Sequence, residues 1–123
     1  MNAHGYQQYK EQSVNTMTKS EMLLLLLDEL VKRIMRAEIA LKQENYELFD
    51  QSITRAVEIV MYLKSTLNRK YEISGELSRM YDFFIFDLSR IKAGRDEAVI
   101  LELRPLVEDL RNTFREAGKQ VQN

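Results

Sequence analysis

The sequence predicts an all-α fold, an antiparallel up-down-up-down four-helix bundle with a mobile N-terminal arm. Apolar residues recur at steps of three and four through four successive stretches, as they do along one face of a helix. Short polar connections separate the stretches, which makes consecutive helices antiparallel neighbours. No stretch has the alternation of β-branched residues that is typical of a strand. We therefore expect an arm at residues 1–17, a bundle at 18–117 and a disordered tail at 118–123.

The first helix is expected over residues 18–43, and the rest of the chain is organised around it. Thr18 and Glu21 have the spacing of a capping box, in which each side chain accepts from the other residue's backbone N–H. The inward stripe is Leu23, Leu26, Leu27, Leu30, Ile34, Ala37 and Leu41. Two i,i+4 ion pairs are expected on the polar side, Asp28–Lys32 and Glu29–Arg33. Because Met22–Leu27 is apolar at every position, it must be central in the bundle or offer surface to a partner.

The second and third helices carry more apolar surface than one stripe. Asn45 is the expected N-cap of the second helix, residues 46–67, and Gly94 the stop of the third, residues 73–93. The second stripe is Phe49, Ile53, Ala56, Val60, Leu63 and Leu67. The third stripe is Ile73, Leu77, Met80, Tyr81, Phe84, Leu88 and Ile91. The surplus lies at Val57, Ile59, Met61, Tyr62, Phe83 and Phe86.

The last helix is expected to start at Asp96, which has the position of an N-cap. Its inward stripe is Val99, Leu103, Leu106, Leu110 and Phe114. Pro105 lies inside this stretch, lacks an amide proton and clashes with the carbonyl four residues earlier. The pattern therefore predicts a kink or a frayed segment over residues 101–105.

Composition excludes several kinds of site. The 18 basic and 19 acidic residues nearly balance, so the chain has no net positive charge that would attract nucleic acid or an anionic membrane. The chain has no cysteine, and its one histidine, His4, lies in the arm, so we expect no disulfide, metal, cofactor or Ser-His-Asp site. The four glycines lie singly, which excludes a glycine-rich phosphate loop. Without a ~20-residue apolar run or a signal peptide, the protein is expected to be cytoplasmic.

One enzymatic class is compatible with this composition, a helical catalyst of the chorismate-mutase kind that binds a dicarboxylate by inward cations. The candidate cations fall mainly on polar faces of the predicted helices, namely Arg33, Arg36, Lys42, Arg55, Lys64 and Arg111. We therefore expect no catalytic residues and no enzymatic activity.

The excess of apolar surface favours a binding module, although a tightly packed core or a homodimer seam would account for it too. Met22, Met61 and Met80 lie in or beside the apolar zones, and flexible thioethers suit grooves that accept amphipathic helices. In the arm, Tyr6 and Tyr9 are three residues apart and Val14 follows. The arm is either a docking segment or a disordered tail with incidental aromatic residues.

Several segments together resemble the flagellin-specific export chaperones of bacterial flagellar secretion. In chain order they are Tyr6-x-x-Tyr9, Ser13-Val14-Asn15-Thr16, the leucine-rich first helix, Thr66-Leu67-Asn68, Glu72-Ile73, Met80-Tyr81-Asp82-Phe83 and Leu110-Arg111. The resemblance runs from about Tyr6 to Ala117. The chain departs from the family pattern at Lys19 (usually Pro), Leu26-Leu27 (Leu-Tyr), Glu29-Leu30 (small residues) and Phe114 (Trp), which indicates a divergent member.

The resemblance implies a chaperone that binds the C-terminal segment of flagellin, prevents premature polymerisation and delivers it to the flagellar type III export apparatus. It also implies that the arm covers a client groove in the free protein, and it suggests an export-gate protein as a further partner. The residues we expect to contact the client are Tyr6, Tyr9, Val14, Leu24, Leu27, Met61, Tyr62, Tyr81 and Phe84. The protein is expected to be a monomer or a weak dimer. The alternative interpretation is a homodimeric helical adapter without a flagellin client.

Overall fold

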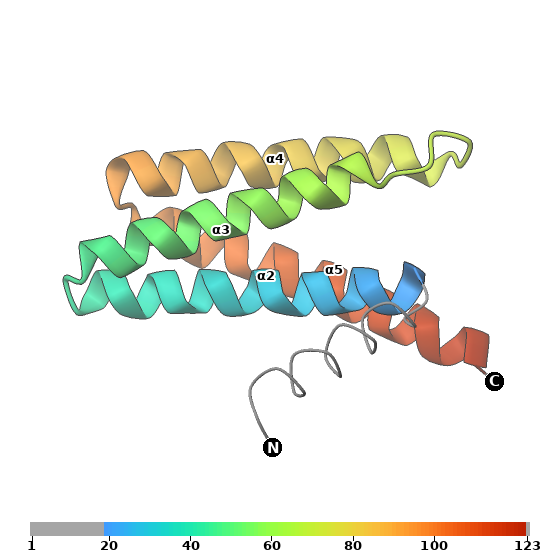
Figure 1. The fold of residues 1–123 in the computed structure, drawn as a ribbon, viewed down its shortest axis with the longest axis horizontal. Coiled ribbons are helices and arrows are strands. Elements are labelled where there is room, and N and C mark those ends of the chain that lie inside the picture. The colour runs from blue at the N-terminus through green and yellow to red at the C-terminus, as the bar shows by residue number, and fades with distance from the viewer. Residues whose placement is uncertain (1–18, 123) are drawn as a thin grey trace, which may run out of the picture.

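The structure, a computed structural model, describes residues 19–122. This part of the chain forms four helices and no strand: α2 (Lys19–Lys42), α3 (Tyr46–Ser65), α4 (Ile73–Gly94) and α5 (Glu97–Gln122). Successive helices run antiparallel (Figure 1). Helix α2 packs against α3 and α5, and α4 packs against the same two helices. The predicted all-α four-helix fold is confirmed.

The core takes one stripe from every helix. Its largest fully buried side chains are Leu27, Leu30, Ile34, Phe49, Ile53, Leu63, Tyr81, Phe84, Leu88, Ile91, Ile100 and Leu103. Helices α2 and α3 share the most extensive contact in the bundle. Buried Ala37 and Ala40 on α2 and Ala56 on α3 are small, which suits so close an approach.

Two predicted caps are confirmed. The Asn45 Oδ1 atom accepts from the Leu48 N–H at 3.2 Å, and the Asp96 Oδ1 atom accepts from the Ala98 and Val99 N–H groups at 3.0 and 3.3 Å. Each carboxamide or carboxylate thereby pairs helix-start N–H groups that have no carbonyl partner. The predicted cap at Thr18 lies outside the described residues.

Helix α4 ends at Gly94 as predicted, but the left-handed residue that follows is Arg95, with φ of 49°. The Arg95 guanidinium lies 3.7 Å from the centre of the Tyr46 ring. A cation over an aromatic face contributes about 0.5–1 kcal/mol at an exposed site. This contact offsets part of the strain of a non-glycine residue in that conformation.

The prediction for the last helix needs three corrections. Residues 101–105 are helical, so the expected fraying at Pro105 does not occur. Leu106 is 45% exposed, and Ile100 and Val107 are buried in its place. The stripe Ile100, Leu103, Val107 and Leu110 keeps steps of three and four, which turns position 106 outward. The helix also continues past Ala117, the predicted end of the bundle, to Gln122.

Helix α4 needs a related correction, because Ile73 and Met80 were expected to face inward but are 57% and 40% exposed. Both residues line a cavity between α4 and α5. In Figure 1, α5 runs away from α4 toward its C-terminal end. The two side chains therefore border an open seam and not a packed core.

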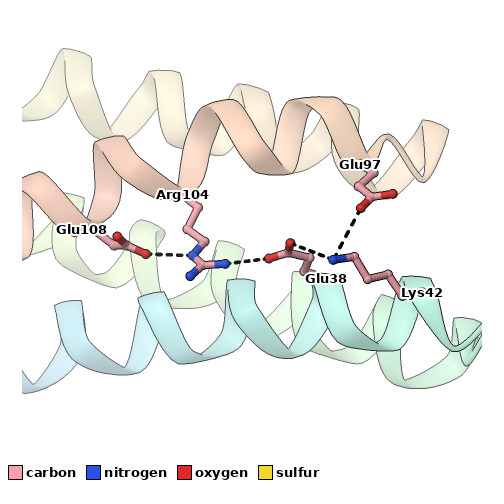
Figure 2. Close-up of polar contacts among 5 residues, drawn as sticks. All are labelled: Glu38, Lys42, Glu97, Arg104 and Glu108. Carbon is pink, nitrogen blue, oxygen red and sulfur yellow. Dashed lines mark hydrogen bonds and ion pairs between the residues drawn. The ribbon is translucent and has the colours of Figure 1, made fainter.

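Ion pairs hold α2 to α5 (Figure 2). The Arg104 Nη1 and Nε atoms donate to Glu38 at 2.8 Å and to Glu108 at 2.7 Å. These bonds, first to Glu108 and then to Glu38, raise the pKa of Arg104 above its ordinary value. Lys42 extends the network, with its Nζ atom 3.4 Å from Glu38 and 3.8 Å from Glu97.

The predicted pair Glu29–Arg33 is present at 2.7 Å. Asp28, expected to pair with Lys32, instead reaches across to α5 and lies 3.0 Å from Arg115 and 3.6 Å from Arg111. Asp28 therefore adds to the ion pairs that connect α2 to α5. No helix of the described chain is long and apolar enough to cross a membrane.

Candidate functional site

An apolar cavity lies between α4 and α5, and we call it the α4–α5 groove. Its volume is about 760 Å³. Its apolar walls are Ile73, Leu77, Met80, Phe83, Phe84, Leu106, Leu110, Phe114 and Ala117. Glu76, Arg79, Asp109 and Thr113 also line the groove. An open apolar channel with a few charges is the form that accepts one face of an amphipathic helix.

A second cavity, of about 600 Å³, lies where α2 begins and α3 ends, and we call it the end pocket. All four helices line it. Its residues are Lys19, Ser20, Met22, Leu23, Leu26, Tyr62, Leu63, Thr66, Leu67, Asn68, Leu77, Tyr81 and Phe114. Leu77 and Phe114 line both the end pocket and the α4–α5 groove. The two cavities therefore adjoin.

A third cavity, of about 530 Å³, lies between α3 and α4, and we call it the α3–α4 pocket. It is lined by Met61, Lys64, Ser65, Leu67, Arg69 and Ile85. It shares Leu67 with the end pocket. The Lys64 Nζ atom donates to Asp82 on α4 at 2.6 Å, which fixes the two helices beside this cavity. The three cavities follow one another around the bundle, and we call them together the apolar belt.

Tyr81 connects the core to the end pocket. The side chain is 1% exposed, and its ring packs edge-on against Phe84 with centres 6.4 Å apart. Burial raises the pKa of the Tyr81 hydroxyl to about 12. The hydroxyl therefore stays protonated at neutral pH. No side-chain hydrogen bond among the described residues involves this hydroxyl, and the fully buried side-chain oxygen without a partner in the described chain is Ser52 Oγ.

Residues 2–121 match the model of a protein family described as flagellar protein FliS. The chain belongs to the FliS family. This confirms the family resemblance seen in the sequence. No group of His, Cys, Asp and Glu side chains in the described chain could hold a metal ion.

Two relatives carry the description flagellar secretion chaperone FliS. The protein of Bacillus subtilis (strain 168) is 30% identical over 112 residues, which cover 91% of this chain and 84% of the relative. The protein of Vibrio cholerae serotype O1 (strain El Tor Inaba N16961) is 18% identical over 123 residues, which cover 95% and 90%. A crystal structure of a bacterial flagellar chaperone has the same fold, with a TM-score of 0.79 and 18% identity over 95% of this chain and 97% of that one.

The predicted contact residues fall into three groups. Tyr6, Tyr9 and Val14 lie outside the described residues. Met61 and Tyr62 are 58% and 53% exposed, and each lines a cavity of the apolar belt. Met61 and Tyr62 are therefore available to a partner.

The other four predicted contacts are less accessible. Leu24 is half-buried and lines none of the three cavities. Tyr81 and Phe84 are core residues, each 1% exposed, that form walls of the end pocket and the α4–α5 groove respectively. Leu27 is completely buried, so its assignment as a client contact is corrected to a core residue. Leu27 belongs to the core cluster to which all four helices contribute side chains.

Sequence reasoning missed most walls of the α4–α5 groove, including Ile73, Phe83, Leu106 and Phe114. Three of these had been placed on inward stripes, and Phe83 was seen only as surplus. The sequence feature that indicated a groove was the surplus of apolar residues on α4, which carries aromatic residues on more than one face. Which face borders an open seam follows from the tilt of α5 and not from either helix alone.

Proposed function

We propose that this protein is a cytoplasmic, non-enzymatic chaperone that binds the C-terminal segment of flagellin. It prevents premature polymerisation and supports delivery of flagellin to the flagellar type III export apparatus. The observation that carries this proposal is the apolar belt, since its three adjoining cavities suit a long client better than a single compact ligand. The descriptions of the two relatives as flagellar secretion chaperones support it.

The exposed side chains are consistent with this function. Ile73, Phe83 and Leu106 are each 45% exposed or more and line one groove. A contiguous apolar surface on a protein in water is usually covered by a partner. A client that is unfolded as a monomer and helical when assembled would be covered along its apolar face by such a belt.

Leu106→Ser tests the α4–α5 groove, and Leu101→Ser is its matched control. Both leucines are exposed on α5, at 45% and 55%, but only Leu106 lines the groove. Covering a half-exposed leucine contributes about 1–1.5 kcal/mol, so Leu106→Ser should weaken binding of a C-terminal flagellin segment about tenfold by calorimetric titration. Leu101→Ser should bind the segment with the affinity of the unsubstituted protein, and both variants should keep its melting temperature.

Absence of binding by the unsubstituted protein at tens of micromolar would contradict the proposal. Light scattering tests the homodimeric alternative on the same samples. A monomeric mass supports a groove that is open to a client. A stable two-chain mass that Leu106→Ser reduces to one chain would mean that the groove is a dimer seam.

A further inference from the structure

The polar lining of the end pocket differs from that of the α4–α5 groove. Glu76 and Asp109 bring carboxylates to the groove. Among the described residues that line the end pocket there is no carboxylate side chain, and Lys19 is the one charged residue. The remaining polar groups there are hydroxyls and one carboxamide, from Ser20, Tyr62, Thr66, Tyr81 and Asn68.

Two of these groups are already engaged within the protein. Thr66 Oγ1 donates to the Leu63 carbonyl at 2.8 Å, and Asn68 Oδ1 accepts from the Lys70 N–H at 3.0 Å. The Asn68 amide NH₂ remains as a donor. The pocket thus combines an apolar floor with a cation and hydrogen-bond donors.

The Tyr81 hydroxyl is the second, independent observation. Its side chain is 99% removed from solvent, lines the pocket and lacks a hydrogen-bond partner among the described residues. The hydroxyl is therefore a donor at the pocket wall that a ligand bringing an acceptor into the pocket would pair. An acceptor oxygen with apolar side chains beside it therefore complements this site.

We propose that the end pocket receives the free C-terminus of the client chain. Its last apolar side chains lie against Leu26 and Leu63, and its carboxylate is held by the Lys19 ammonium and the Tyr81 hydroxyl. Charge complementarity selects this occupant, because the described residues of the pocket present a carboxylate with one cation and no anion. Capture of a terminal carboxylate is an established mode of peptide recognition. The inference rests on the proposed function, since it presupposes a client that is bound by its C-terminal segment.

Calorimetric titration with three peptides tests the inference. They are the C-terminal flagellin segment with a free carboxylate, the same peptide amidated at its C-terminus, and the peptide shortened by its last three residues. Loss of a charge-assisted hydrogen bond should weaken binding of the amide about fivefold to tenfold. The shortened peptide should bind more weakly still, but measurably, through the α4–α5 groove.

Two variants locate the effect in the pocket. Lys19→Gln should weaken binding of the free acid severalfold and leave binding of the amide unchanged, because the amide has no charge to pair. Tyr81→Phe removes one oxygen from a core side chain, so it should weaken binding of the free acid severalfold while thermal stability stays equal or rises. Lys32→Gln is the matched control, as Lys32 is exposed on the same helix and lines neither cavity.

The outcomes separate the two proposals. Equal affinity for acid and amide would overturn the C-terminal assignment and leave the proposed function standing. Sensitivity to Tyr81→Phe without sensitivity to amidation would mean that an internal group of the client occupies the pocket, and would overturn it too. If none of the three peptides binds, the proposed function itself fails.

Discussion

Tyr81 is both a core residue and part of the wall of the end pocket. Its ring packs edge-on against Phe84 in the core, and its side chain lines the end pocket. The sequence placed Tyr81 on an inward stripe and also among the client contacts. Both placements are compatible with the structure, because a tyrosine presents an apolar body and a polar tip.

The Tyr81 hydroxyl should make stability fall at high pH. Its pKa of about 12 in the folded protein exceeds the ordinary value of 10.0, so the folded state holds the proton more tightly. This contribution is complete below pH 10 and is lost as the pH rises toward 12. A difference of this size corresponds to roughly 2–3 kcal/mol.

Urea unfolding of the protein and of Tyr81→Phe between pH 8 and 11.5 measures this contribution. The free energy of unfolding of Tyr81→Phe should fall less steeply above pH 10. Tyr62→Phe, which alters an exposed ring, should follow the unsubstituted protein. If the free energy of unfolding fell equally steeply with pH for Tyr81→Phe and the unsubstituted protein, the raised pKa of Tyr81 would be contradicted.

At the scale of single elements, α5 is helical despite Pro105. Proline lacks the N–H that would pair with the carbonyl of residue 101, and its ring clashes with that carbonyl. Tertiary contacts on either side compensate, since Leu103 and Val107 are fully buried and Arg104 is bonded to Glu38 and Glu108. The sequence predicted fraying because local propensity contains none of these contacts.

Pro105→Ala should therefore stabilise the protein. Residue 105 is exposed, so the substitution removes little packing and restores a backbone hydrogen bond. An interior proline costs about 3 kcal/mol relative to alanine, offset by the smaller entropy of its unfolded chain. We expect the free energy of unfolding to rise by about 1–2 kcal/mol in urea titrations. The control Glu102→Ala, on the exposed side of α5, should change it by less than about 0.5 kcal/mol.

Over the whole molecule, the helices are joined unequally. Charges connect α2 to α5 through Asp28 and through the Arg104 network of Figure 2. The Lys64–Asp82 pair and a 2.9 Å hydrogen bond from Lys92 to Thr54 connect α3 to α4. Within the described residues, no ion pair or side-chain hydrogen bond joins α4 to α5 or α2 to α3, but α2 and α3 pack over the most extensive contact of the four neighbouring pairs and α4 and α5 over the least. The least extensively packed of these seams, between α4 and α5, is the one that contains the α4–α5 groove.

Hydrogen exchange should report this inequality. In the presence of the C-terminal flagellin segment, backbone amides that flank the α4–α5 groove, at residues 73–84 and 106–117, should exchange more slowly. Amides at residues 37–56, which line none of the three cavities, should be unaffected and serve as the internal reference. Protection confined to residues 37–56 would place the client on a different face and contradict the groove assignment.

The sequence alone determined the four helices, the caps at Asn45 and Asp96, most of the core and the family resemblance. These follow from local chemistry and from the helical repeat, both of which are written in consecutive residues. The sequence could not determine which surplus apolar residues border a cavity. Leu106 was expected in the core, but the structure buries Val107 and exposes Leu106. The sequence also could not pair Asp28 with Arg115, since those charges lie on helices at opposite ends of the chain.

Only the tertiary structure decided these points, because they depend on how α5 tilts away from α4 and against α2. That tilt arises from the summed packing of four helices, and a rotation of a few tens of degrees moves a side chain from core to groove. The conversion of Leu27 from client contact to core residue has the same origin. An apolar run in the sequence indicates that its side chains must be shielded from water. The arrangement of the neighbouring helices decides whether the core or a partner shields them.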